Sequence, residues 1–150
     1  MPTATFARSR RRLFLRHAHP ISAWTRWATT PAVLVPLWRR RWSAAIPVAA
    51  WMAINPIVTP PVTDDHAFAT RAMLGEEEWT TDPRADRGLI ALNVVGSACL
   101  AAAGLAAWRR RRLPMTVGVA GSMIITLLSW RGYAQLYDRG DRSALPLPTE

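Results

Sequence analysis

The sequence predicts an all-α integral membrane protein of two helical hairpins, with three to four transmembrane helices and an acidic extracytoplasmic loop. Residues 88–108 contain no charged residue. As a helix they would be roughly 30 Å long, which matches the hydrocarbon core of a bilayer. Arginine clusters at residues 39–41 and 109–112 follow apolar runs directly, and residues 59–87 hold seven acidic residues against three arginines. Alternating apolar runs and charge clusters of this kind are typical of a multi-pass membrane protein.

The first hairpin is expected at residues 22–38 and 42–58. Pro31 and Pro36 interrupt the first run, so its helix is expected to be short or broken. The second run would be about 25 Å long as a helix.

The second hairpin is expected at residues 88–108 and 114–130. Within the outer loop, residues 59–87, Thr63 is a plausible N-cap for a short helix that stops at Gly75.

Basic residues dominate the composition: the chain has 19 arginines, no lysine and a net charge of +9. We expect a basic tail at residues 1–15, a helical membrane domain at 16–138 and a polar tail at 139–150. The single cysteine, Cys99, excludes an intramolecular disulfide.

Positive charge marks the cytoplasmic side of a membrane protein. The arginine turns at 39–41 and 109–112 are therefore predicted to face the cytoplasm, with loop 59–87 outside the plasma membrane. The side of the N-terminus stays open. If residues 22–38 cross the bilayer, the N-terminal arginines lie outside, against the charge rule. If this run is a shallow interfacial helix, they stay inside. We favour three full spans and one shallow helix.

Polar side chains at membrane depth are the first candidate site. Asn93 and Ser97 lie one helical turn apart in the long apolar run, and Asn55 lies near the outer end of the second run. Both asparagines are expected in the outer half of the membrane, where they could meet. The simpler interpretation is an interhelical hydrogen bond worth about 0.6–2 kcal/mol; the alternative is a ligand or ion site.

Arginine and tryptophan gather where lipid headgroups would lie. Tryptophan prefers this level for its amphipathic ring, and arginine can grip a lipid phosphate bidentately. Interfacial anchoring explains the pattern most simply. The candidate lipid-binding residues are Arg16, His17, Trp24, Arg26, Arg39, Arg40, Arg41, Arg109, Arg110, Arg111 and Arg112.

The outer loop supplies a third candidate, Glu76 with Trp79. Asp64, Asp65 and His66 also offer ligand atoms for a divalent metal, but their spacing matches no metal motif. We therefore expect no metal and no cofactor. The interleaved apolar runs favour a membrane over nucleic acid as the partner of the positive charge.

A series of motifs resembles an uncharacterised prokaryotic membrane-protein family classed as a domain of unknown function. The resemblance spans about residues 14–138, and it implies a small helical membrane protein of bacteria or archaea with no established activity. His19 stands where relatives commonly have asparagine, which argues against a chemical role for it. The matching residues are Arg16-His17-Ala18-His19-Pro20, Trp24-Thr25-Arg26, Asn55-Pro56, Pro60-Pro61, Leu74-Gly75-Glu76, Trp79 and Leu92-Asn93.

Three functions remain open. The leading hypothesis is a non-enzymatic membrane scaffold or partner-binding subunit whose basic inner face binds anionic lipid headgroups; we assign no catalytic residue. A membrane enzyme acting on a lipid headgroup is the alternative, using Arg16, His17, Arg26 and Glu76. The third is a small channel or transporter formed by oligomerisation around Asn93. A homo-oligomer or a membrane-protein partner fits the first and third.

Overall fold

The computed structural model describes residues 14–140, and within this range it consists of helices and turns without a strand. Residues 1–13 and 141–150 of the two expected tails lie outside the described residues. The elements, in chain order, are α2 (Pro20–Ala28), η1 (Thr30–Leu34), α3 (Val35–Arg39), η2 (Trp42–Ala44), α4 (Ala45–Val58), α5 (Phe68–Trp79), η3 (Pro83–Ala85), α6 (Arg87–Trp108) and α7 (Arg112–Arg139).

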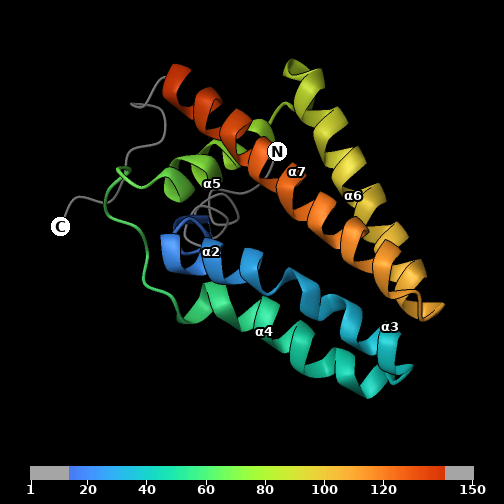
Figure 1. The fold of residues 1–150 in the computed structure, drawn as a ribbon. Helices are drawn as coiled ribbons and strands as arrows, with labels where there is room; N and C mark the ends of the chain where they lie inside the picture. Colours follow the sequence, from blue (N-terminus) through green and yellow to red (C-terminus); the bar gives the residue numbers. More distant parts are fainter. Residues whose placement is uncertain (1–13, 141–150) are drawn as a thin grey trace.

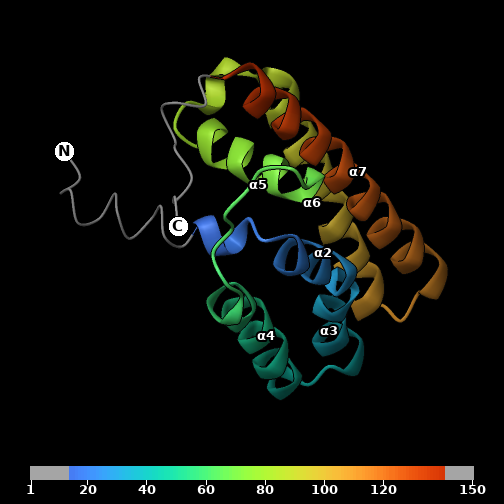
Figure 2. The ribbon, with the colours of Figure 1, turned by 90° about the vertical axis from the view of Figure 1, so that its left-hand side faces the viewer.

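The first expected helix is divided into three pieces. Pro31 lies at the start of η1 and Pro36 at the start of α3, where a missing backbone N–H costs no helical hydrogen bond. The pieces still run in one direction, and α4 returns alongside them (Figures 1 and 2). Arg40 makes the turn possible with a left-handed φ of 51°.

The second hairpin is the longest part of the molecule. Helices α6 and α7 run antiparallel and side by side (Figure 1). Close packing depends on Gly118, where a Cβ atom would lie 3.0 Å from the Cys99 carbonyl oxygen and 3.0 Å from Ala103 Cβ. Both helices are long and apolar enough to cross a membrane; residues Trp42–Val58 form an apolar but shorter stretch.

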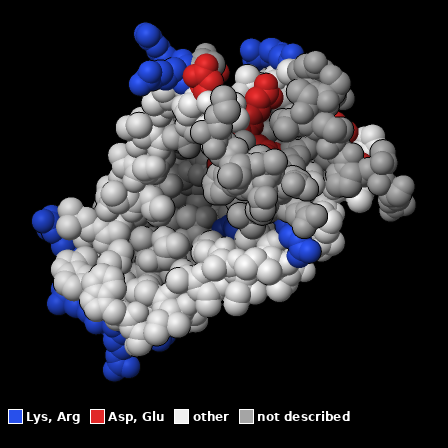
Figure 3. All heavy atoms as spheres, turned by 180° about the vertical axis from the view of Figure 1, so that it is seen from behind, with Lys and Arg blue, Asp and Glu red and all other residues white. Residues whose placement is uncertain are grey.

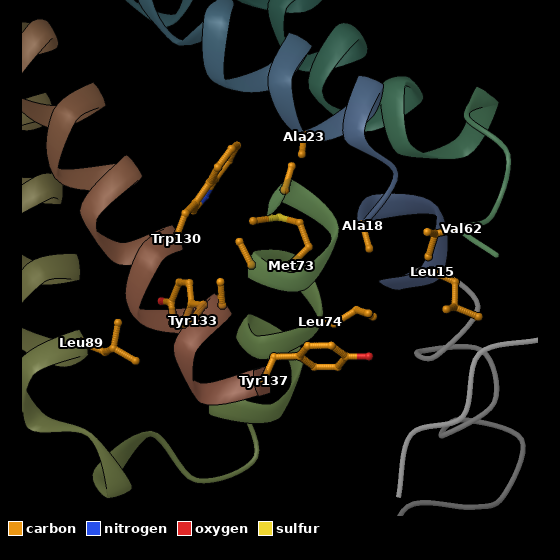
Figure 4. Packing of buried hydrophobic residues seen from close by; sticks show 13 residues of the cluster. Leu15, Ala18, Ala23, Val62, Met73, Leu74, Leu89, Trp130, Tyr133 and Tyr137 are labelled. Carbon is orange, nitrogen blue, oxygen red and sulfur yellow. The ribbon is translucent and has the colours of Figure 1, made fainter. Parts of the chain in front are cut away.

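Helix α7 ends at Arg139 rather than near Trp130. The extension persists because Tyr133, Ala134 and Tyr137 are buried. Their side chains join one core cluster with residues of α5, and Figure 4 shows Tyr137 next to Leu74.

The helix of the outer loop differs from its prediction at both ends. It begins after Ala67, not Thr63, and continues through Gly75 to Trp79. Gly75 lies inside the helix because α5 crosses α7 there. A Cβ atom at residue 75 would be 1.9 Å from the backbone oxygen of Tyr133.

The two ends of the molecule have different charge. The turns at 39–41 and 109–112 lie together at one end, joined by a hydrogen bond from Arg40 to the Trp108 carbonyl. Residues 14–19 lie at the other end with α5, since Thr70 Oγ1 donates to the Ala18 carbonyl at 3.0 Å. Figure 3 shows arginines at the lower end, arginines with acidic residues at the upper end, and mostly uncharged residues between.

Candidate functional site

Arginine and tryptophan from both hairpins meet at the basic end. The Arg40 guanidinium donates to the Trp108 carbonyl at 3.0 Å and lies 5.0 Å from the centre of the Trp108 ring. Arg110 lies 5.3 Å from the Trp38 ring, and Trp42 stacks on Trp108 at 6.5 Å. Two turns that are distant in the sequence therefore form one surface, which we call the Arg–Trp patch.

The Arg–Trp patch is well suited to anions. All seven of its arginines are exposed, and neither turn contains an acidic residue. Guanidinium groups bind phosphate oxygens with paired hydrogen bonds, and their delocalised charge is weakly hydrated. The arginines of the patch are Arg39, Arg40, Arg41, Arg109, Arg110, Arg111 and Arg112.

Three of the candidate residues come together at the end of the molecule where residues 14–19 pack on α5, which we call the acidic end. His17 Nε2 lies 3.9 Å from a carboxylate oxygen of Glu76. The Arg26 guanidinium contacts the His17 ring and donates to the His17 carbonyl at 3.0 Å. Arg16 is separate: it is exposed and donates to the Ile57 carbonyl.

Glu76 also borders a polar cavity of about 200 Å³ between α5, α6 and α7. Asn93 and Tyr133 line it as well, and Asn93 Nδ2 donates to the Tyr133 hydroxyl at 2.7 Å and to the Leu89 carbonyl at 2.8 Å. Ser97 lies on its rim, exposed. Tyr133 was not among the predicted site residues, because it follows the point where the sequence predicted α7 to end.

Asn55 belongs to a different contact. Its Oδ1 accepts from Ser22 Oγ at 2.7 Å, and its Nδ2 donates to Thr25 Oγ1 at 2.9 Å, so it joins α4 to α2. Asn93 instead joins α6 to α7. Asn55 and Asn93 could meet on depth alone, but in the structure each amide faces its own neighbouring helix.

The tryptophans near the polar cavity pack against other aromatic rings. Trp24 makes edge contacts with Trp27 at 5.7 Å and with Trp130 at 5.3 Å. Trp79 lies against Tyr133 at 5.5 Å. Trp24 is thus placed against aromatic rings of α2 and α7.

The alternative of a divalent metal at Asp64, Asp65 and His66 gains no support from the described part of the chain. Over residues 14–140, no group of three or more histidine, cysteine, aspartate or glutamate side chains could hold a metal ion. His66 instead donates its backbone N–H to Asp64, at 3.0 Å.

The helices and the two polar ends define a small all-helical protein with two helices long and apolar enough to cross a membrane. Comparison with family models shows more: the chain belongs to a family of unknown function, DUF6653, whose model matches residues 9–113. The resemblance to an uncharacterised family is thereby confirmed. The matched segment stops where α7 begins, so Tyr133 lies outside it. No curated protein and no solved structure matches the chain.

Proposed function

We propose that this chain is a multi-pass protein of the plasma membrane whose basic end binds anionic lipid. Length and apolar composition support membrane insertion of α6 and α7. The exposure of their side chains supports it further, because only 22% of the most apolar stretch of each is buried within the chain. The core helix of a soluble protein would be mostly covered. Lipid would cover the large exposed apolar side chains Val94, Val95, Leu105, Leu113, Val117, Ile124 and Leu128.

The geometry favours four crossings. Residues 20–39 run beside α4 between the acidic end and the Arg–Trp patch, in parallel with the long hairpin (Figure 2). If α6 and α7 cross the bilayer, the broken helix crosses with them. This arrangement supports the crossing alternative for residues 22–38 over the shallow helix. The seven arginines of the patch support a cytoplasmic position for that end, because positive charge is enriched on the cytoplasmic side.

The Arg–Trp patch is the single observation that supports the function. Tryptophans and arginines from two distant turns gather at the level where headgroups would lie, with exposed apolar helices beginning next to them. A scaffold or partner-binding subunit would use this patch to hold anionic lipid around it. The arginines would act together rather than singly.

Replacing the arginines of one turn should weaken binding of anionic lipid. Each arginine near an anionic surface contributes ~1 kcal/mol. The triple variant Arg39→Gln, Arg40→Gln, Arg41→Gln should therefore bind phosphatidylglycerol on the order of 100-fold more weakly. Native mass spectrometry in mild detergent, with phosphatidylcholine as the reference lipid, measures the change.

A matched control removes three exposed arginines from the acidic end: Arg84, Arg87 and Arg139. That variant loses the same net charge and should keep its preference for phosphatidylglycerol. Equal loss in both variants would assign the effect to overall charge, and the patch would not be the binding surface.

A second candidate function is a membrane enzyme acting on a lipid headgroup. The contact between His17 and Glu76 favours it, since an imidazole beside a carboxylate is an arrangement used in general acid–base catalysis. Arg26 holds the ring, and the exposed Arg16 could bind a phosphate. The oligomeric channel has no comparable support, because Asn93 uses its amide on Leu89 and Tyr133 within the chain.

Both candidate functions require particular residues to lie on a particular side of the membrane, and thiol labelling tests this. In a Cys99→Ala background, single cysteines at Arg16 and Thr81 should react in intact cells with a reagent that cannot cross the membrane. A cysteine at Ser43 should react only after lysis. All three parent residues are exposed. Labelling of residue 81 without residue 16 would exclude both the four crossings and the headgroup enzyme.

A further inference from the structure

We propose that a groove between the η1–α3 segment and α6 is a discrete binding site for one anionic phospholipid, with an acyl chain in the groove and the phosphate on the Arg–Trp patch. This inference rests on the proposed function and gives it a specific site. It commits to one occupant, a lipid with a negatively charged headgroup.

The groove has the size and lining of a hydrocarbon site. It is an open groove with a volume of about 720 Å³, within the range of about 300–1,000 Å³ that is usual for ligand pockets. Small residues of α6, Ala101 and Gly104, form one side. Larger side chains form the walls: Val33, Leu34, Leu37, Leu100, Leu105 and Trp108.

Water is a poor occupant of this groove. Apart from Ser97, the side chains that line it are apolar, and a water molecule needs two to four polar partners. An acyl chain needs no polar partner, and each methylene group that it buries contributes about 0.8 kcal/mol to binding.

The mouth of the groove determines which lipid fits. Trp42 and Trp108 line the groove and stack on one another at 6.5 Å. Arg40 lies over the Trp108 ring and holds its carbonyl. The apolar lining therefore continues directly into the arginine patch, which contains no acidic residue. A chain in the groove would bring its phosphate to these guanidinium groups.

Charge also argues against a protein helix in the groove. An apolar helix could cover the same lining, but it would leave the seven arginines of the patch without counter-charges. A single phospholipid would cover the apolar lining with its acyl chain and pair the arginines with its phosphate.

Filling the groove tests the site. Ala101→Trp places a large ring where the acyl chain would lie, and Ala102→Trp is the matched control, since Ala102 is the neighbouring exposed alanine and does not line the groove. We expect native mass spectra to show one tightly retained phosphatidylglycerol on the wild type and on Ala102→Trp. On Ala101→Trp its affinity should fall about tenfold or more, the factor that two excluded methylene groups contribute.

The outcomes separate this site from the proposed function. Retention by Ala101→Trp, together with loss in the Arg39–Arg41 triple variant, would overturn the groove site and leave the basic surface intact. Retention of phosphatidylglycerol by both variants would overturn the groove site and the lipid-binding function of the Arg–Trp patch. Loss of phosphatidylglycerol and phosphatidylcholine alike would overturn the anionic specificity. Loss of a dimer instead of a lipid would identify a second copy of the chain as the occupant, against this proposal.

A second substitution protects the test from a folding defect. Leu105 also lines the groove and is 51% exposed, so Leu105→Trp fills the groove from its open side with less strain on the packing. If Ala101→Trp unfolds, Leu105→Trp should still lose the lipid, and its retention would overturn the site.

Discussion

Gly75→Ala should destabilise the protein by about 3 kcal/mol or more, because residue 75 is where α5 meets the backbone of α7. A Cβ atom there would lie 1.9 Å from the Tyr133 carbonyl oxygen and 2.6 Å from its carbon. Both atoms belong to the backbone of α7, so no side-chain rotation relieves the overlap. Inserting a methylene group into a packed core typically costs 1–3 kcal/mol, and a rigid neighbour places this site at or above the upper limit. Thermal unfolding in lipid nanodiscs should show a melting temperature ~10 °C lower.

Gly121→Ala is the matched control. A Cβ atom at residue 121 would meet only the Cys99 sulfur, at 3.8 Å, which is ordinary van der Waals contact. Alanine also has the higher helix propensity, by about 1 kcal/mol. We expect Gly121→Ala to melt at or slightly above the wild-type temperature. If Gly75→Ala also melts at or above the wild-type temperature, α5 and α7 do not approach as closely as the structure has them at residue 75.

Gly75 also shows what a single sequence does not determine. Glycine commonly follows the last turn of a helix, so the sequence alone predicts a helix that stops at Gly75. Glycine serves equally well where another backbone approaches closely. Only the position of α7 distinguishes the two roles, and a single sequence does not contain it. The same reason explains why the sequence does not predict the extension of α7 beyond Trp130. This polar segment of α7 is covered by α5, and a single sequence does not contain that contact.

Apolar runs and charge clusters are more informative about the fold than Gly75 is. The charge-free run at 88–108 coincides closely with α6, and the arginine clusters mark the turns of both hairpins. These features follow from local composition. Contacts between helices depend in addition on rotation about each helix axis, which depth alone does not determine. Depth alone allows Asn55 and Asn93 to meet, but the rotation of the helices turns Asn55 towards α2 and Asn93 towards α7.

The cluster at the acidic end shows the same limit. Glu76 and His17 both lie in the motifs that resemble the family, and the alternative enzyme uses both residues. Their contact at 3.9 Å depends on the packing of residues 14–19 against α5, through the hydrogen bond from Thr70 to Ala18. Thr70 had no signal in the sequence that would have linked it to the N-terminal segment.

Asn55→Leu is expected to cost about 2 kcal/mol and to loosen α4 from α2. Asn55 is 4% exposed and uses both ends of its amide, accepting from Ser22 and donating to Thr25. Leucine preserves the bulk but leaves the buried Ser22 hydroxyl without its acceptor. An unsatisfied buried polar group costs about 1–3 kcal/mol, and interhelical hydrogen bonds in membranes contribute about 0.6–2 kcal/mol. Chemical unfolding in mild detergent measures the loss.

A double-mutant cycle then tests the pairing itself. Removing both partners, with Ser22→Ala added to Asn55→Leu, should cost less than the sum of the single variants, because no orphaned hydroxyl remains. Asn55→Leu combined with Asn93→Leu should instead be additive within about 0.5 kcal/mol, since the two amides bond to different helices. Coupling between the two asparagines, together with additivity between Ser22 and Asn55, would contradict the observed helix rotations. It would restore the contact that depth alone suggested.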